Sequence, residues 1–503
     1  MSTSHTLSSA ITSGITLTAS GANGTPFTIT SAGSINDSSA AESYGALTGT
    51  VLSTVTNAGH VTSNRYGIYL RAGGLLTNTG SIYGGTNGVK GEHITAILGI
   101  DNFQYNSATS TLVNDGSIGG GGYAVQFEHG GVVTNYGDIN ASSYGDGVNI
   151  SDLPGTVLNT GSISGAIDVQ LTNGGYVSNS STGVLQTTNP AFGQGVAVGG
   201  GNATVVNAGR ITGTYTGIYS RGAGNLDIRN SGTITGESVA SAYSAGIWVY
   251  GATGGVTIEN SGLIKSAEGA SGEAITIANP AATFTNLNLV VDTGARFVGT
   301  VYADAGATNI VDLTSGASAG TLSARSGAFV NFGSLIIASG ASWTIDGDAA
   351  LHTEFPTIAG FTGKDGVALT GSNNAISHVG SGSGLTTVTL TGTDAQTLTF
   401  AGTFASGFTI ASVAGVQTLE TICFLPGTLI RTPDGEVPVE TLQTGDLVAT
   451  LRNGARPVKW IGTGKVLAPR GQRGPATPVI VRQGALGDHI PSRDLHVTKA
   501  HAL

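Results

Sequence analysis

The stretch VLNTGSI at residues 157–163 is one copy of a phrase that decides the fold. The phrase, apolar-x-Asn-x-Gly-x-apolar, recurs along the first half of the chain, and a degenerate copy, VSNSSTGV, lies at 177–184. Its asparagines are Asn57, Asn78, Asn114, Asn135, Asn159, Asn179, Asn207, Asn230 and Asn260. A repeat of about 21–24 residues with insertions is typical of solenoid proteins, in which each unit stacks on the next.

A second phrase lies between copies of the first. Examples are YGIYL (66–70), DGVNI (146–150) and TGIYS (216–220). Each unit therefore offers about three short strands with alternating apolar residues. Such strands bury their inner face only when units stack roughly 4.8 Å apart. The predicted fold is all-β: a right-handed parallel β-helix, or β-solenoid.

The regular form of the first phrase makes two further predictions about the turn. Asparagine side chains at one position of successive units can stack as a hydrogen-bonded ladder along the solenoid. The glycine two residues after each asparagine suits a turn with positive φ.

Composition supports this architecture and excludes several classes of protein. The 503 residues include 81 glycines and only 10% charged residues, a composition that fits many short strands and tight turns. The presence of a single cysteine rules out an internal disulfide framework. The net charge of −10 argues against a nucleic-acid partner. The sequence contains no apolar stretch of 18 residues, so we predict no transmembrane segment, and no N-terminal signal peptide is visible.

The composition changes at the single cysteine, Cys423. Residues 1–422 carry 10 Lys and Arg against 24 Asp and Glu, whereas residues 423–503 carry 10 against 6. We therefore expect an N-terminal cap at 1–45, solenoid repeats at 46–345, a C-terminal β cap or linker at 346–422 and a separate domain at 423–503.

An enzymatic solenoid would need two carboxylates on one exposed face. The candidates are Asp138, Asp146, Asp152 and Asp168, but they occupy different offsets in successive units, so nothing predicts that they meet. Aromatic residues flank the second phrase and offer an alternative, a sugar-stacking surface: Tyr66, Tyr69, Tyr215, Tyr219, Trp248 and Tyr250. We predict no cofactor and no metal site.

The repeated Asn-x-Gly phrase resembles that of some autotransporter passenger domains and large bacterial adhesins. The resemblance implies a secreted bacterial protein with a structural or adhesive role, located outside the cell or on its surface and bound to an extracellular polysaccharide or matrix. Export would then use a route without a visible N-terminal signal peptide.

The end of the chain carries a different set of motifs. It opens with CFLPGTLIRTPDGEVPVETLQTGDLVAT (423–450), where Asp434-Gly435 predicts a hairpin turn, and closes with DLHVTKAHAL (494–503). These motifs resemble those of the Hint (Hedgehog/intein) domain of the type that ends secreted bacterial proteins. They are a cysteine at a domain boundary, the Gly-Thr that follows, the GDLV segment and a Thr-x-x-His pair.

This resemblance implies autocatalysis and not turnover of a substrate. Cys423 would attack the preceding carbonyl and convert the Ile422–Cys423 peptide into a thioester, with His501 as general acid and Thr498 holding the scissile amide. Water, an amine or a protein would then resolve the thioester by cleavage or ligation. Because the family's later strands are not seen before Leu503, the domain looks truncated.

Two alternatives remain open at this point. One is a polysaccharide-binding or polysaccharide-degrading β-helix, and the other is a structural solenoid with an inactive Hint remnant.

Overall fold

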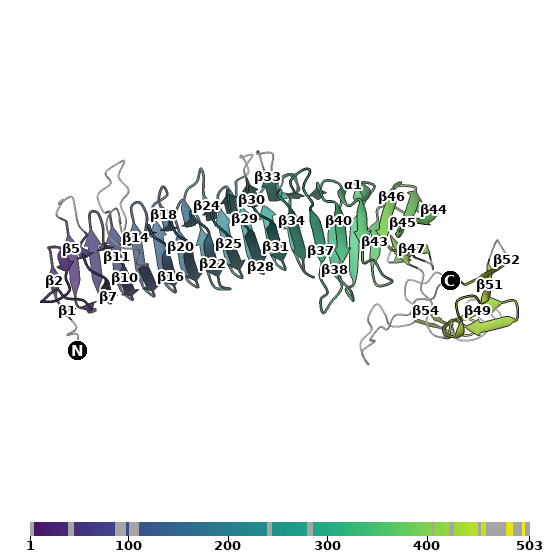
Figure 1. The fold of residues 1–503 in the computed structure, drawn as a ribbon, viewed down its shortest axis with the longest axis horizontal. Coiled ribbons are helices and arrows are strands. Elements are labelled where there is room, and N and C mark those ends of the chain that lie inside the picture. Colours follow the sequence, from purple (N-terminus) through teal and green to yellow (C-terminus); the bar gives the residue numbers. More distant parts are fainter. Residues whose placement is uncertain are drawn as a thin grey trace. The chain divides into compact units, whose positions relative to one another are not determined.

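The computed structural model describes residues 5–38, 45–85, 97–99, 110–238, 244–278, 285–404, 407–413, 415–421, 427–450, 454–458, 479–485 and 495–497. The described chain is almost entirely β-structure (Figure 1) and divides into two compact units. The first comprises residues 1–312 and 328–332, and the second comprises residues 313–327 and 333–503.

The first unit is a parallel β-solenoid of three sheets, in which every third strand belongs to the same sheet (Figure 1). Sheet A contains β1 (His5–Leu7), β4 (Phe27–Ile29), β7 (Ser53–Asn57), β10 (Gly74–Asn78), β13 (Ser110–Asn114), β16 (Gly131–Asn135), β19 (Gly155–Asn159), β22 (Gly175–Asn179), β25 (Ala203–Asn207), β28 (Leu226–Asn230), β31 (Val256–Asn260), β34 (Leu287–Val291) and β37 (Ile310–Leu313).

Sheet B contains β2 (Ala10–Ile11), β5 (Ser34–Asp37), β8 (His60–Ser63), β11 (Ser81–Gly84), β14 (Ser117–Gly120), β17 (Asp138–Ala141), β20 (Ser162–Ser164), β23 (Val184–Gln186), β26 (Arg210–Gly213), β29 (Thr233–Gly236), β32 (Leu263–Ser266) and β35 (Arg296–Val298).

Sheet C contains β3 (Ile15–Leu17), β6 (Leu47–Gly49), β9 (Ile68–Leu70), β12 (Ile97–Gly99), β15 (Val125–Phe127), β18 (Asp146–Ile150), β21 (Ile167–Leu171), β24 (Gln194–Gly199), β27 (Thr216–Arg221), β30 (Ala245–Tyr250), β33 (Glu273–Ala278), β36 (Thr300–Tyr302) and β39 (Phe329–Val330). A short 3-10 helix, η1 (Gly269–Ser271), precedes β33.

Each coil contributes inward apolar residues from all three sheets to a continuous core. In one coil these residues are Val157, Ile163 and Val169, all fully buried. A single coil could not shield them, so their burial depends on the coils above and below. Parallel coils, about 13 in all, run from residue 5 to residue 368, which confirms the predicted β-solenoid. Strands within the expected N-terminal cap, residues 5–37, already belong to sheets A, B and C.

The asparagine ladder is confirmed. The Nδ2 of each asparagine from Asn57 to Asn230 donates to the Oδ1 of the next one along the nine-residue series, at 2.7–2.9 Å. The ladder ends where Ile29 pairs with Asn57 and where Val291 pairs with Asn260.

The predicted reason for the glycine after each asparagine is wrong. The glycines of the phrase are not among the residues with positive φ. Instead, a Cβ on Gly80 would lie 2.1 Å from the carbonyl oxygen of Gly59, and one on Gly137 would lie 2.1 Å from that of Gly116. Glycine is required because adjacent coils approach closely at this corner.

The second unit begins with parallel strands and ends with antiparallel ones. Its first part contains β38 (Gly320–Ala324), β40 (Ser334–Ile337), β41 (Trp343–Gly347), α1 (Leu351–Glu354), β42 (Thr357–Ala359), β43 (Gly366–Leu369), β44 (Ala375–Gly382), β45 (Leu385–Thr391), β46 (Thr397–Ala401), β47 (Phe408–Val413) and β48 (Val416–Thr421). Strands β38, β41, β43, β48 and β47 form, in that order, a five-stranded sheet, here called sheet G.

The remaining described segments form three two-stranded antiparallel pairs. Their elements are β49 (Leu429–Thr432), β50 (Gly435–Pro438), the 3-10 helix η2 (Val439–Thr441), β51 (Leu447–Thr450), β52 (Gly454–Pro457), β53 (Val479–Val481) and β54 (Leu495–Val497). Across the described part of the chain, no helix has both the length and the apolar character needed to span a membrane.

Candidate functional site

The predicted scissile bond directly follows a strand in the interior of sheet G. β48 pairs antiparallel with β43 on one side and with β47 on the other, and its Leu419 is fully buried. Burial also raises the pKa of the Glu420 carboxyl. β48 ends at Thr421; its pairing with β43 reaches Leu419, and its pairing with β47 continues to Thr421, the residue before Ile422.

The four predicted site residues, Ile422, Cys423, Thr498 and His501, lie outside the described residues. The strands that flank them in sequence are described. β54 carries His496 opposite Ile480 of β53 and ends at Val497, immediately before Thr498.

The segment that follows Cys423 is a hydrogen-bonded hairpin. Thr432 of β49 pairs with Gly435 of β50, so the turn residues are Pro433 and Asp434, and not the predicted Asp434 and Gly435. The hydroxyl of Thr432 closes this turn by donating to the Gly435 carbonyl at 2.7 Å.

Glu440, in η2, makes a contact that sequence reasoning missed. Its Oε2 accepts from the backbone N–H of Gly427 at 2.7 Å, and the N–H of Val439 donates to the Thr428 carbonyl at 2.7 Å. These two bonds fix the Gly-Thr turn that begins four residues after Cys423. No sequence motif links a carboxylate to a glycine thirteen residues earlier.

The acidic candidates on the solenoid do not gather on one exposed face. Asp138 is exposed on sheet B, and Asp152 contacts His129 at 3.4 Å. Asp146 and Asp168, however, lie on the adjacent strands β18 and β21 and interact electrostatically. Both side chains are buried, so this pair does not lie on an exposed face, as an enzymatic pair would require.

Asp168 is nevertheless buried away from any large ligand. Its side chain is fully buried; Oδ1 accepts from the Gly165 N–H at 3.1 Å, and Oδ2 has no partner among the described residues. Desolvation, with a smaller contribution from Asp146, raises the pKa of Asp168 well above its usual value. The neighbouring coils have Gly147 and Gly195 at the corresponding position, and these leave room for the buried carboxyl.

The aromatic candidates form two separate groups on sheet C. Tyr219 pairs with Trp248 on the adjacent strands β27 and β30, whereas Tyr66 and Tyr69 contact each other with ring centroids 5.3 Å apart.

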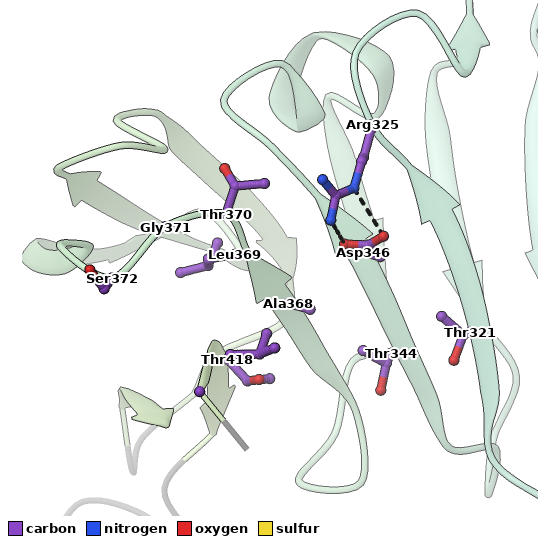
Figure 2. A pocket seen from close by; sticks show the side chains of 12 residues that line it. Thr321, Arg325, Thr344, Asp346, Ala368, Leu369, Thr370, Gly371, Ser372 and Thr418 are labelled. Carbon is purple, nitrogen blue, oxygen red and sulfur yellow. Dashed lines mark hydrogen bonds and ion pairs between the residues drawn. The ribbon is translucent and has the colours of Figure 1, made fainter. Parts of the chain in front are cut away.

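A groove of about 870 Å³ lies within the second unit (Figure 2). Its walls come mainly from sheet G and include Thr321, Thr344 and Thr418, with Arg325 and Asp346 across one side. Arg325 donates from Nε and Nη2 to the two carboxylate oxygens of Asp346 at 3.0 and 2.8 Å. This hydrogen bonding, assisted by the charges of Asp346, Asp348 and Asp394, raises the pKa of Arg325 above its usual value.

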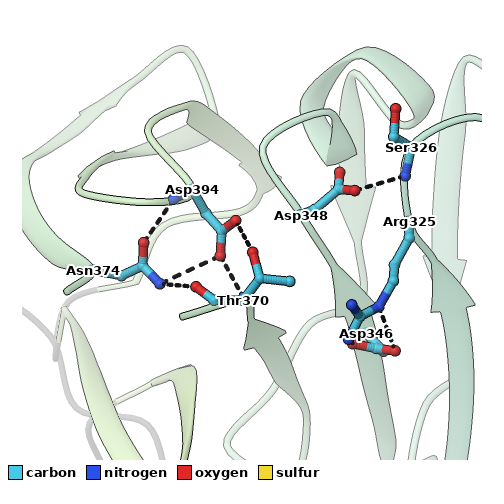
Figure 3. A network of polar contacts seen from close by, with 7 residues as sticks. All are labelled: Arg325, Ser326, Asp346, Asp348, Thr370, Asn374 and Asp394. Carbon is cyan, nitrogen blue, oxygen red and sulfur yellow. Dashed lines mark hydrogen bonds and ion pairs between the residues drawn. The ribbon is translucent and has the colours of Figure 1, made fainter. Parts of the chain in front are cut away.

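A polar network supports this groove (Figure 3). Asp348 accepts from the N–H of Ser326 at 2.9 Å, which ties the loop after β41 to the loop after β38. Asp394 accepts from the Thr370 N–H at 2.5 Å, from the Thr370 hydroxyl and from Asn374 Nδ2 at 3.3 Å. These bonds tie the loop after β45 to the loop after β43. The described residues contain no group of three His, Cys, Asp or Glu side chains that could hold a metal ion.

Together, the stacked coils and the terminal hairpins define a β-solenoid followed by a C-terminal β-region. That region is of the Hint type: residues 422–503 match the family model of the Hint domain. No curated protein and no solved structure matched the chain.

Proposed function

We propose that the Hint domain cleaves the chain at the Ile422–Cys423 bond by an N-to-S acyl shift. The observation that carries this proposal is the position of the only cysteine. Cys423 is the second residue of the Hint match and lies two residues after β48 ends. A thiol attached to the scissile amide attacks its carbonyl through a five-membered ring, so proximity replaces a bimolecular encounter.

The proposed step forms one bond and breaks one. Cys423 Sγ loses its proton and bonds to the Ile422 carbonyl carbon, the C–N bond breaks, and the Cys423 nitrogen gains a proton. His501 supplies that proton as general acid, and Thr498 holds the amide by a hydrogen bond. The interior position of β48 supports this chemistry because strand pairing restrains the chain immediately before the scissile bond.

A second nucleophile then resolves the thioester. Water yields a carboxylate at Ile422, and an amine or a protein amine yields a new amide. In each case the Cys423 thiol is released. The solenoid leaves as one product and the fragment that begins at Cys423 as the other.

Hydroxylamine tests this proposal, because it attacks thioesters far faster than amides. Mass spectrometry of the treated chain should reveal a hydroxamate at Ile422 and a fragment beginning at Cys423. Cys423→Ala should abolish the reaction, and His501→Ala should slow it by about 10²–10⁴. His496→Ala is the matched control and should cleave at the original rate. An intact chain after prolonged treatment would refute the proposal.

For the solenoid we propose a structural or adhesive role outside the cell or on its surface. The acidic, disulfide-free coils and the buried amide ladder support this role, since they stabilise a long surface without a redox-dependent bond. Protease treatment of intact source cells should digest the solenoid. Protection equal to that of a cytoplasmic marker would contradict this location.

A further inference from the structure

The sheet G groove presents one face of a well-ordered sheet. Leu322, Ile345, Val367 and Leu419 point to the buried side of β38, β41, β43 and β48. The alternate residues therefore face the groove. Thr321 pairs with Thr344 across β38 and β41, and Ala368 pairs with Thr418 across β43 and β48.

The groove contains threonine hydroxyls and guanidinium N–H donors that are available to a ligand. The hydroxyls of Thr321, Thr344 and Thr418 make no side-chain hydrogen bond to any described residue. Arg325 engages Asp346 through Nε and Nη2, and its side chain is 54% exposed, which leaves the Nη1 donors toward solvent (Figure 2). A ligand with many hydroxyls can pair with all of these groups.

Apolar surface alternates with the polar groups. Ala368 and Val416 also line the groove, together with the methyl groups of the threonines. Such a mixture suits the C–H faces and hydroxyl edges of a sugar ring. The volume of about 870 Å³ falls in the range of small-molecule sites, roughly 300–1,000 Å³.

The charge near the groove disfavours an anionic ligand. Three carboxylates, those of Asp346, Asp348 and Asp394, act on the single guanidinium of Arg325. Asp348 and Asp394 are held by backbone N–H groups, so they cannot turn away (Figure 3). The net negative charge would repel a uronate or a phosphate, whereas it would not repel uncharged hydroxyls.

We propose that the sheet G groove binds a short neutral oligosaccharide. Every residue that lines it precedes Ile422, so the site is complete on the solenoid product as well as on the uncleaved chain. The binding proposal is thus independent of whether the Ile422–Cys423 bond breaks.

Calorimetric titration of the 503-residue chain tests the proposal. The probes are neutral tetrasaccharides of glucose, mannose, xylose and N-acetylglucosamine, with tetragalacturonate as the anionic probe. At least one neutral probe should bind, and tetragalacturonate should bind more weakly. Hydrogen exchange should slow in peptides that cover Thr344 and Thr418 when the bound sugar is present.

Isosteric variants then locate the site. The double variant Thr344→Val and Thr418→Val removes two hydroxyls without changing shape and should weaken binding about tenfold. Thr257→Val, on the partly exposed face of β31, is the matched control and should bind as the original chain does. Failure of all neutral probes, preference for tetragalacturonate, or unchanged affinity in the folded double variant would each overturn the proposal.

Discussion

Side chains tie successive segments of the chain together in both units, but the chemistry differs. In the first unit, amides from Asn57 to Asn260 bond to one another at 2.7–2.9 Å. In the second unit, carboxylates bond to backbone N–H groups instead: Asp365 accepts from Trp343 at 2.9 Å and Asp394 accepts from Thr370 at 2.5 Å.

The difference follows from what each group can do. An amide both donates and accepts, so a ladder of asparagines extends over any number of coils. An ionised carboxylate only accepts, so it must meet a donor on the next coil and cannot pair with a copy of itself. Regular repeats therefore favour asparagine, and the irregular coils near the end of the solenoid can use aspartate.

Exchanging the two chemistries should have the largest effect. In Asn159→Asp, the oxygen that replaces Nδ2 would face the Asn179 Oδ1 and the Gly161 carbonyl, both of which are acceptors. The other oxygen would keep the Asn135 Nδ2 donor, but a buried charge that faces two acceptors should lower the free energy of unfolding by about 3–5 kcal/mol at neutral pH. Urea unfolding followed by circular dichroism measures it.

The pH dependence of the Asn159→Asp variant separates the buried charge from a loss of packing. A protonated carboxyl at this position can donate to the Asn179 Oδ1, so the stability deficit relative to the original chain should shrink as pH falls. Asn140→Asp, at an exposed position of β17, is the control and should stay near the original stability. An equal loss in both variants would contradict the ladder as the cause.

The ladder could be predicted from sequence because its asparagines sit in a short phrase that recurs with the coil. The electrostatic interaction of Asp146 with Asp168 could not, because Asp146 lies two residues before Val148 whereas Asp168 lies one before Val169.

The groove could not be predicted from the sequence for a different reason. Thr321 and Thr418 are far apart in sequence and line the same groove only because β48 turns back antiparallel beside β43. No repeat phrase marks this reversal. The Hint match, in contrast, rests on local motifs around Cys423 and agrees with the resemblance inferred from them.

Removing one carboxylate from the second unit should have the next largest effect. Asp394 is 1% exposed and accepts from Thr370 and Asn374. Asp394→Asn would point an amide N–H at one of these donors and should cost about 2–3 kcal/mol of unfolding free energy. Thermal unfolding measures it, with Asp434→Asn in the exposed hairpin turn as the control. Stability equal to that of the control would show that these bonds are dispensable.

Asp168 gives the smallest effect and the sharpest comparison, because it is a carboxyl in the first unit that lacks the donors Asp394 has. Burial raises its pKa well above 3.8, so the folded chain binds this proton more tightly than the unfolded chain. Its contribution to stability is therefore complete below pH 3.8 and is lost as pH rises toward the folded pKa.

Asp168→Asn cannot lose a proton, so its stability relative to the original chain should rise between acid and neutral pH. The nearby Asp146 adds to the effect by repelling the ionised form. Urea midpoints of both chains across this range measure the change, and Asp138→Asn on the exposed face of β17 should show none. A difference between the Asp168→Asn chain and the original that is constant with pH would mean that the carboxyl ionises as freely in the folded chain as in the unfolded one.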